Sequence, residues 1–163
     1  MYVDKQLEFS DAQAVTSTAI SSNVYDTLTK TTGAATISGA TTGNTRLDLG
    51  GQFQDLYLVI QTAVTITDAG SDATLVATFE TADDVGLSTN ATVLLSSGTL
   101  AFATYATAGS QILVAKLPSA LYRRYIGVRY TVASGPFTAG AIDAFLTTAP
   151  QINRIYKSAF TVQ

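Results

Sequence analysis

The 163-residue sequence contains no histidine, no cysteine and no tryptophan, and charged residues make up only 13% of it. Without histidine, the Ser-His-Asp and Cys-His catalytic arrangements cannot form, and the most common transition-metal ligand is missing. Without cysteine there is no disulfide and no thiolate chemistry, so cysteine usage does not indicate the redox compartment. These absences exclude most hydrolase mechanisms. We therefore expect a protein that is not an enzyme and that binds no cofactor.

A large excess of charge of one sign is also lacking, because the net charge is only −3 and the pI is about 4.6. No overall basic field is present to hold nucleic acid or an anionic membrane, so neither is expected as a partner. The stretch from Val85 to Ala115 carries no charge, but Asn, Ser, Gly and Gln interrupt it, which favours paired strands over a membrane span. Acidic residues near the start argue against an export signal, so we expect synthesis in the cytoplasm.

The acidic residues allow two further readings. Glu80, Asp83 and Asp84 lie close together in the sequence, as a glycosidase acid and base would, but no aromatic cleft is suggested beside them. Residues 68–72 have the oxygen-rich composition of a calcium loop, yet the twelfth position from Asp68 is Phe79 and not the glutamate of an EF-hand. We predict a hairpin turn there and no metal site, with a calcium ion held by Asp83-Asp84 and another loop as the open alternative.

What the sequence does contain is alternation of apolar and polar residues, which predicts strands. The segment 55–67 and the segment 74–80 each place apolar residues on one face, and we expect them to pair as a hairpin. The inward set of the first segment is Leu56, Leu58, Ile60, Val64 and Ile66. Further strands are predicted at 3–9, 92–95, 99–105, 111–117, 121–133 and 141–148.

These strands, at turn spacings near ten residues, predict one domain over residues 1–163. Its fold class is all-β, an antiparallel two-sheet sandwich, with a jelly roll favoured. Residues 1–50 would hold the N-terminal strands and an extended arm or loop at Thr29–Thr45, which is rich in Thr, Gly and Ala. Residues 51–149 would form the sandwich core. Residues 150–163 would form a tail that is too apolar to remain free in solvent.

The tract from Tyr122 to Gly140 combines a basic, aromatic strand with a Gly-Pro turn. Successive side chains of a strand point to opposite faces, so the tract has an apolar inward set, namely Tyr122, Ile126, Val128, Tyr130 and Val132. The outward set contains Arg123, Tyr125, Gly127 and Arg129. Tyr and Arg are enriched in protein interfaces, so the outward set is a candidate contact surface, although an ordinary solvated face explains the pattern as well.

Several segments resemble the capsid cement (decoration) proteins of short-tailed bacteriophages. The resemblance is carried by Val3–Thr16, Asp55–Gln61, Glu80–Asp84, Arg123–Gly140 and Tyr156–Val162. It implies a jelly-roll protein, dimeric or another small homo-oligomer, on the outer surface of a mature virion. Such a protein bridges neighbouring major capsid proteins and stabilises the expanded shell.

Under this reading we expect six residues to contact the partner: Arg123, Tyr125, Arg129, Phe145, Ile152 and Tyr156. Phe145 is included because Ile142, Ala144 and Leu146 take the inward positions of its strand and leave it outward. The alternative is a carbohydrate- or receptor-binding sandwich of a phage tail, in which Tyr57, Tyr105 and Tyr125 would stack on sugar rings. A single-stranded nucleic-acid binder using the Arg-Tyr face is a third reading, which the overall acidity disfavours.

Overall fold

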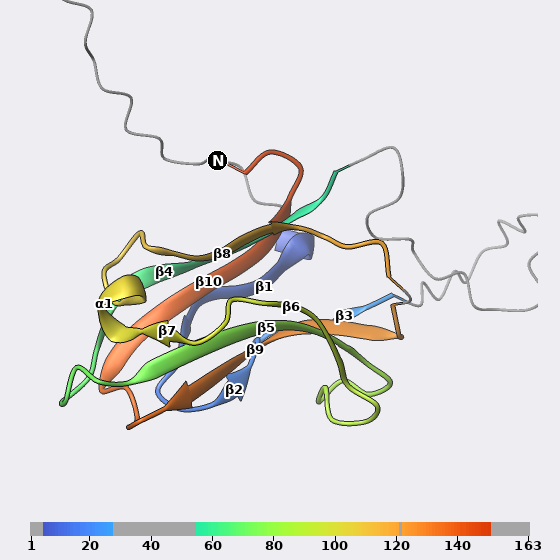
Figure 1. Cartoon of the computed structure of the whole chain (residues 1–163). Helices are drawn as coiled ribbons and strands as arrows, with labels where there is room; N and C mark the ends of the chain where they lie inside the picture. The colour runs from blue at the N-terminus through green and yellow to red at the C-terminus, as the bar shows by residue number, and fades with distance from the viewer. Residues whose placement is uncertain (1–4, 28–54, 121, 151–163) are drawn as a thin grey trace, which may run out of the picture.

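Two antiparallel β-sheets pack face to face in the computed structural model, which describes residues 5–27, 55–120 and 122–150 (Figure 1). The first sheet has the strand order β1 (Glu8–Ala14), β10 (Ala139–Thr147), β4 (Tyr57–Thr67), β8 (Gln111–Lys116). The second has the order β2 (Ala19–Ile20), β9 (Tyr125–Ala133), β5 (Thr74–Ala82), β6 (Thr92–Ser96), with β3 (Tyr25–Asp26) also on β9 and β7 (Leu100–Ala101) also on β5. The helical turns are η1 (Lys5–Leu7) and α1 (Phe102–Tyr105).

This strand order is that of a jelly roll, because the chain crosses repeatedly between the sheets and strands distant in sequence become neighbours. β1, for example, pairs with β10, and β2 pairs with β9. The predicted all-β sandwich is therefore confirmed. The N-terminal strand does lie at a sheet edge, but β1 begins at Glu8, because residues 5–7 form the helical turn η1, and Val3 lies outside the described residues.

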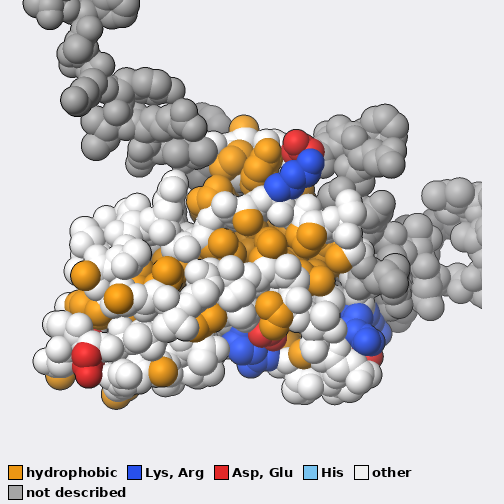
Figure 2. Space-filling model, in the orientation of Figure 1, with side chains coloured by type: hydrophobic (Ala, Val, Ile, Leu, Met, Phe, Trp, Pro, Cys, Tyr) orange, Lys and Arg blue, Asp and Glu red, His pale blue; other side chains and the backbone are white. Residues whose placement is uncertain are grey.

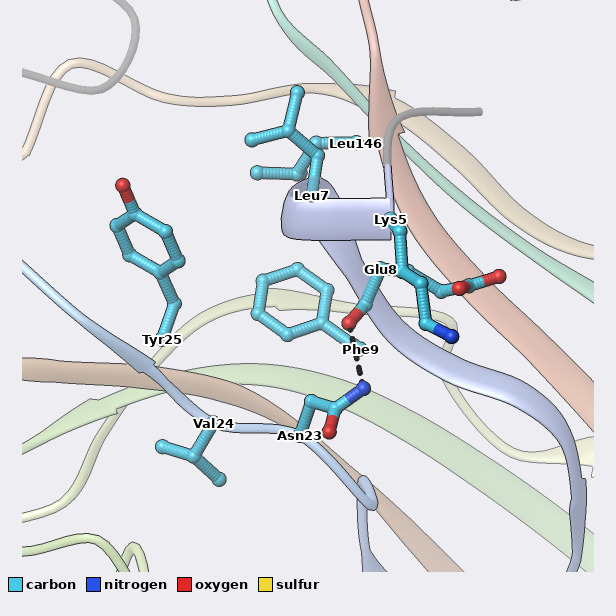
Figure 3. A pocket seen from close by; sticks show the side chains of 8 residues that line it. All are labelled: Lys5, Leu7, Glu8, Phe9, Asn23, Val24, Tyr25 and Leu146. Carbon is cyan, nitrogen blue, oxygen red and sulfur yellow. Dashed lines mark hydrogen bonds between the residues drawn. The ribbon is translucent and has the colours of Figure 1, made fainter. Parts of the chain in front are cut away.

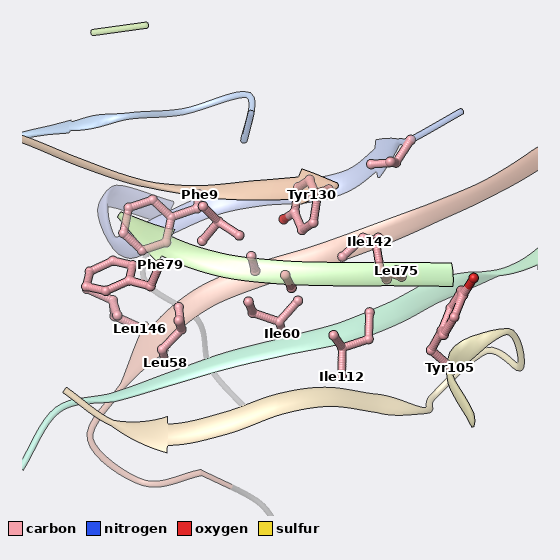
Figure 4. Close-up of a cluster of buried hydrophobic side chains, with 14 of the residues drawn as sticks. Phe9, Leu58, Ile60, Leu75, Phe79, Tyr105, Ile112, Tyr130, Ile142 and Leu146 are labelled. Carbon is pink, nitrogen blue, oxygen red and sulfur yellow. The ribbon is translucent and has the colours of Figure 1, made fainter. Parts of the chain in front are cut away.

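The core between the sheets comes from the alternating residues of the central strands (Figure 4). In β5, Leu75, Ala77 and Phe79 are completely buried, and they lie opposite the buried face of β9. Phe9 from β1 meets Phe79 edge to face with ring centroids 5.8 Å apart, which ties the two sheets together. Each large apolar side chain buried in this way contributes about 1.5–3 kcal/mol to folding.

The expected hairpin between segments 55–67 and 74–80 is wrong. β4 and β5 lie in different sheets, and the turn between them carries the chain from one sheet to the other. The Asp68 carboxylate accepts hydrogen bonds from the backbone N–H groups of Asp72 and Ala73, both at 3.1 Å, and so holds this crossing. An apolar face can be buried against a facing sheet as well as beside a neighbour in the same sheet, so alternation alone does not distinguish the two arrangements.

Two further strand predictions need correction. The alternation places Val64 inward, but it is 54% exposed, because the β4–β10 register shifts on both sides of Ala141. The strand predicted at 99–105 is only two residues long and continues as α1, where Tyr105 turns into the core and its hydroxyl donates to the Ala73 carbonyl at 2.8 Å. The predicted arm at 29–45 and residues 151–163 of the tail lie outside the described residues.

Candidate functional site

Arg129, the central residue of the predicted basic face, is bound within the molecule. It extends from β9 over β5, where its Nε donates to the two carboxylate oxygens of Glu80 at 3.1 and 3.0 Å. Its Nη2 donates to the Leu87 carbonyl at 2.6 Å. The Glu80 side chain is only 6% exposed and also accepts a hydrogen bond from Thr78 Oγ1. Arg129 therefore neutralises a buried carboxylate and fixes the loop after β5, and the additional hydrogen bonds offset part of the cost of burying the two charges.

The loop that Arg129 fixes, residues 83–90, is organised around Asp84. The Asp84 carboxylate accepts hydrogen bonds from the backbone N–H groups of Gly86, Ser88 and Thr89 and from the Ser88 hydroxyl. These hydrogen bonds, that from Thr89 first, lower the pKa of Asp84 to about 2. The Asp84 carboxylate therefore stabilises the conformation of its own loop.

The outer face of β9 is covered by this loop and by the segment around β2. A methyl group added at Gly127 would lie 2.9 Å from Leu87 Cδ1, 3.2 Å from Ser21 Oγ and 3.3 Å from Val24 Cγ2. Leu87 is 1% exposed at this contact. A glycine inside a strand often marks such a close approach, so Gly127 was the sequence signal that the face is covered.

The other cations of the tract also have partners. Arg123 Nη1 donates to both carboxylate oxygens of Asp83, at 3.0 and 2.8 Å, and Arg124 binds Asp26 through Nε and Nη2. The Arg124 guanidinium also lies 4.9 Å from the ring centre of Tyr125. Tyr125 is half-buried. The arginines of the tract thus contribute to internal ion pairs that remain partly exposed to solvent.

Phe145 lies on the face opposite Ile142, Ala144 and Leu146, as expected, but it is not exposed. Its side chain is 2% accessible, and Val59, its partner in the β4–β10 register, is 4% accessible. The expectation of an outward contact at Phe145 is therefore corrected, since an aromatic ring on an outer sheet face still gains by packing against its strand neighbours. Ile152 and Tyr156 lie outside the described residues.

The tyrosines named for sugar stacking are not equally available. Tyr105 is completely buried, and burial raises its pKa to about 12. Tyr57 and Tyr125 are half-buried. A stacking platform made of all three is therefore not formed.

A small pocket opens between η1, β1 and the β2–β3 segment (Figure 3). Its volume is about 260 Å³, and it is lined by Lys5, Leu7, Glu8, Phe9, Asn23, Val24, Tyr25 and Leu146. The Asn23 amide donates to the Glu8 carbonyl at 3.1 Å across the pocket wall. Burial, together with the nearby charges of Asp11 and Asp143, raises the pKa of the Glu8 carboxyl. The lining suits one small apolar group with a charged rim.

The most distinctive surface is the side of the sandwich formed by β6, β7, α1 and β8, all of which begin within the uncharged stretch Val85–Ala115. Hydrophobic side chains gather in the middle of the view in Figure 2, and the charged groups visible from this direction lie around them. Val93 is 54% exposed, while Leu94, Leu95 and Leu113 are half-buried against the core. We call this surface the uncharged side. Sequence reasoning singled out the stretch but did not assign it to contacts.

Among residues 5–27, 55–120 and 122–150, no group of three or more Asp or Glu side chains is placed to hold a metal ion. The part of the chain that the structure describes also has no helix with the length and apolarity needed to span a membrane.

Comparison with known proteins gives one family. No curated protein matches the chain. A model of the family described as Bbp16 matches residues 9–146, a stretch that begins in β1 and ends in β10 and so covers the whole sandwich. The chain belongs to the Bbp16 family.

Proposed function

We propose that this protein is a structural virion protein that binds the outside of a mature bacteriophage capsid and cements neighbouring major capsid proteins. The name of the family hints at a phage-related protein, and the sequence segments that resemble cement proteins support the more specific role. In this role the protein acts as a homodimer or another small homo-oligomer and performs no catalysis.

The observation that carries the proposal is the uncharged side. Charged residues are depleted in the buried centre of protein interfaces, because an unpaired charge loses its hydration there. The arginines of the β9 tract, by contrast, are already engaged with Asp26, Glu80 and Asp83. We therefore place the principal capsid contact on the uncharged side, with Tyr125 and the tail residues Ile152 and Tyr156 as additional contacts.

The stabilisation of the shell follows from the binding free energy of the protein. A protein that binds the expanded shell but not its precursor stabilises the expanded shell by the difference in binding free energy. Many copies on one lattice multiply a modest contribution from each contact. An interface of ordinary size, about 800 Å² on each partner, is sufficient.

The test is to mix the purified protein with undecorated expanded shells and with unexpanded precursor shells. We expect co-sedimentation with the expanded shells only, and a higher temperature of shell disruption after binding. Absence of co-sedimentation with expanded shells, at protein concentrations well above those of shell sites, would refute the proposed function.

A further inference from the structure

The sheet edges of the described fold differ in how well they are protected against pairing with another strand. β1 has register shifts after Glu8 and after Ser10, and it carries the acidic side chains of Glu8 and Asp11. Ala12 in this strand has a φ of 42°, which interrupts the extended backbone. Bulges and charges of this kind are the usual protection of edge strands. β1 is thus a poor template for an added strand.

Both edges of the second sheet are made of short strands. β2 and β3 have two residues each, and β6 has five residues with a register shift opposite Phe79 and Glu80. β8, in contrast, pairs with β4 through four consecutive residue pairs, from Tyr57–Lys116 to Ile60–Leu113. Its residues 111–115 include no charge and no proline. β8 is therefore the least protected edge among the described residues.

The register shows which backbone groups of β8 point away from the sheet. Leu117 N donates to the carbonyl of Leu56, the residue directly opposite, at 2.8 Å. Hydrogen-bonded and non-hydrogen-bonded pairs alternate along an antiparallel ladder, so Ala115 and Leu113 also bond to β4. The N–H and C=O groups of Val114 and Lys116 then face outward. In the described part of the chain, β8 pairs only with β4.

The side chains beside this edge define what could lie against it. Val114 is opposite Val59 on the outer face of the sheet, and Leu113 is opposite Ile60 on the core side. Both faces next to the edge are therefore apolar. The first charged group is Lys116, which binds Asp55 at 2.5 Å at the end of the strand. A charged segment placed along residues 111–115 would lose hydration without gaining a partner.

We propose that β8 accepts an extended, uncharged segment of the partner shell subunit as an added strand. The segment forms backbone hydrogen bonds with Val114 and Lys116 and places apolar side chains beside Val114 and Leu113. Strand addition of this kind takes its affinity from main-chain hydrogen bonds and its specificity from alternate side chains. The inference rests on the proposed function and deepens it by naming the contact.

The test compares Val114→Pro with Val114→Ala in binding to undecorated expanded shells. Proline removes the outward N–H of residue 114 and leaves the bonds of Leu113 and Ala115 to β4 in place, whereas alanine removes side-chain contact and keeps the N–H. We expect Val114→Pro to bind at least about tenfold more weakly than Val114→Ala, at similar thermal stability. Equal binding by two folded variants would overturn the proposal.

Hydrogen exchange of the wild-type protein provides a test that does not depend on a variant folding. In the free protein, the amides of Val114 and Lys116 should exchange quickly and those of Leu113 and Ala115 slowly. On shells, the first two should become protected. Binding without this protection would overturn strand addition but leave the proposed function intact, whereas failure of the wild-type protein to bind shells would overturn both.

Discussion

At the scale of single residues, the arginines in the described part of the chain form internal ion pairs rather than a free basic surface. Arg129 neutralises Glu80, whose side chain is 6% exposed, while Arg124 and Asp26 form a pair with 48% and 37% exposure. Removing one partner of a buried pair leaves an uncompensated charge, but an exposed charge is stabilised by water. The two pairs therefore contribute very differently to stability.

We predict that Arg129→Ala lowers the free energy of unfolding by about 2–3 kcal/mol, because Glu80 is left buried without its cation. The matched variant Arg124→Ala should lose much less stability, because its ion pair is exposed to water. Urea unfolding of both variants at neutral pH measures the difference. Similar losses in the two variants would contradict the assignment of Arg129 to a structural role.

Buried tyrosines make stability sensitive to alkaline pH. Burial raises the pKa of Tyr105 to about 12 and also raises that of Tyr130, whose hydroxyl contacts Ser10 at 2.8 Å. In the unfolded chain a tyrosine releases its proton near its ordinary pKa of about 10. The unfolded state then binds fewer protons than the folded state, so the stabilising effect of these groups is complete below about pH 10 and is lost as the pH rises toward about 12.

We therefore predict that the free energy of unfolding falls between about pH 10 and pH 12, and that it falls less steeply in Tyr105→Phe. At about pH 7 the same variant should be less stable by about 1 kcal/mol, because it loses the hydrogen bond to the Ala73 carbonyl. Chemical unfolding at a series of pH values gives both quantities. Parallel pH curves for the variant and the wild type would show that Tyr105 does not contribute to the alkaline loss.

At the scale of secondary-structure elements, the sequence predicted which face of a strand is buried better than it predicted which strands pair with one another. The inward residues of β9, Ile126, Val128 and Tyr130, are buried as expected, because burial on one side imposes a period of two. The pairing of β4 with β10 and β8 could not be derived, since it depends on residues up to 90 positions apart in sequence, as Tyr57 and Thr147 are. Gly127 signals a close approach, but which residue covers it, Leu87, could not be derived for the same reason.

The candidate site was predictable only in part. The outward direction of Arg123, Tyr125 and Arg129 followed from alternation, but the ion pairs of the two arginines depend on where β5 and the loop of residues 83–90 lie. The uncharged stretch was visible in the sequence, whereas its assembly into one side of the molecule required the positions of β6 and β8 in separate sheets.

Gly140 allows β10 to bend where its register with β4 shifts. It has a φ of +131°, and an added methyl group would lie 2.6 Å from Ile66 Cα. We predict that Gly140→Ala lowers the free energy of unfolding by about 2–4 kcal/mol, through backbone strain and a clash with main-chain atoms. Gly98, with a φ of +68° and no atom within 4 Å of the added group, is the control, and Gly98→Ala should cost about 1 kcal/mol. Thermal unfolding of both variants separates the clash with Ile66, which only Gly140→Ala creates, from the cost of a positive φ, which both variants share. Equal losses of stability would contradict the clash.

At the scale of the whole molecule, charge is unevenly distributed, and this distribution relates the fold to the proposed function. The chain segment from Val85 to Ala115 supplies β6, β7, α1 and all of β8 except Lys116 without one charged residue. The four ion pairs among the described residues lie outside this segment. The segment meets a charged group where Arg129 donates a hydrogen bond to the backbone carbonyl of Leu87. One side of the sandwich is thereby left suitable for burial against another protein.

Two equally exposed valines allow this distribution to be tested. Val93 in β6 lies on the uncharged side, and Val64 in β4 lies outside it, each with 54% exposure. A lysine at either site keeps its charge in water in the free protein, so we expect both Val93→Lys and Val64→Lys to fold with stability near that of the wild type. Residue 93 lies opposite Glu80 in the β5–β6 register, but Glu80 is already neutralised by Arg129, so burial of a second ammonium group there in an interface is costly. Val93→Lys should therefore bind expanded shells at least about tenfold more weakly, whereas Val64→Lys should bind normally. Co-sedimentation over a range of protein concentrations measures both affinities, and a loss of binding in Val64→Lys alone would place the capsid contact on another face.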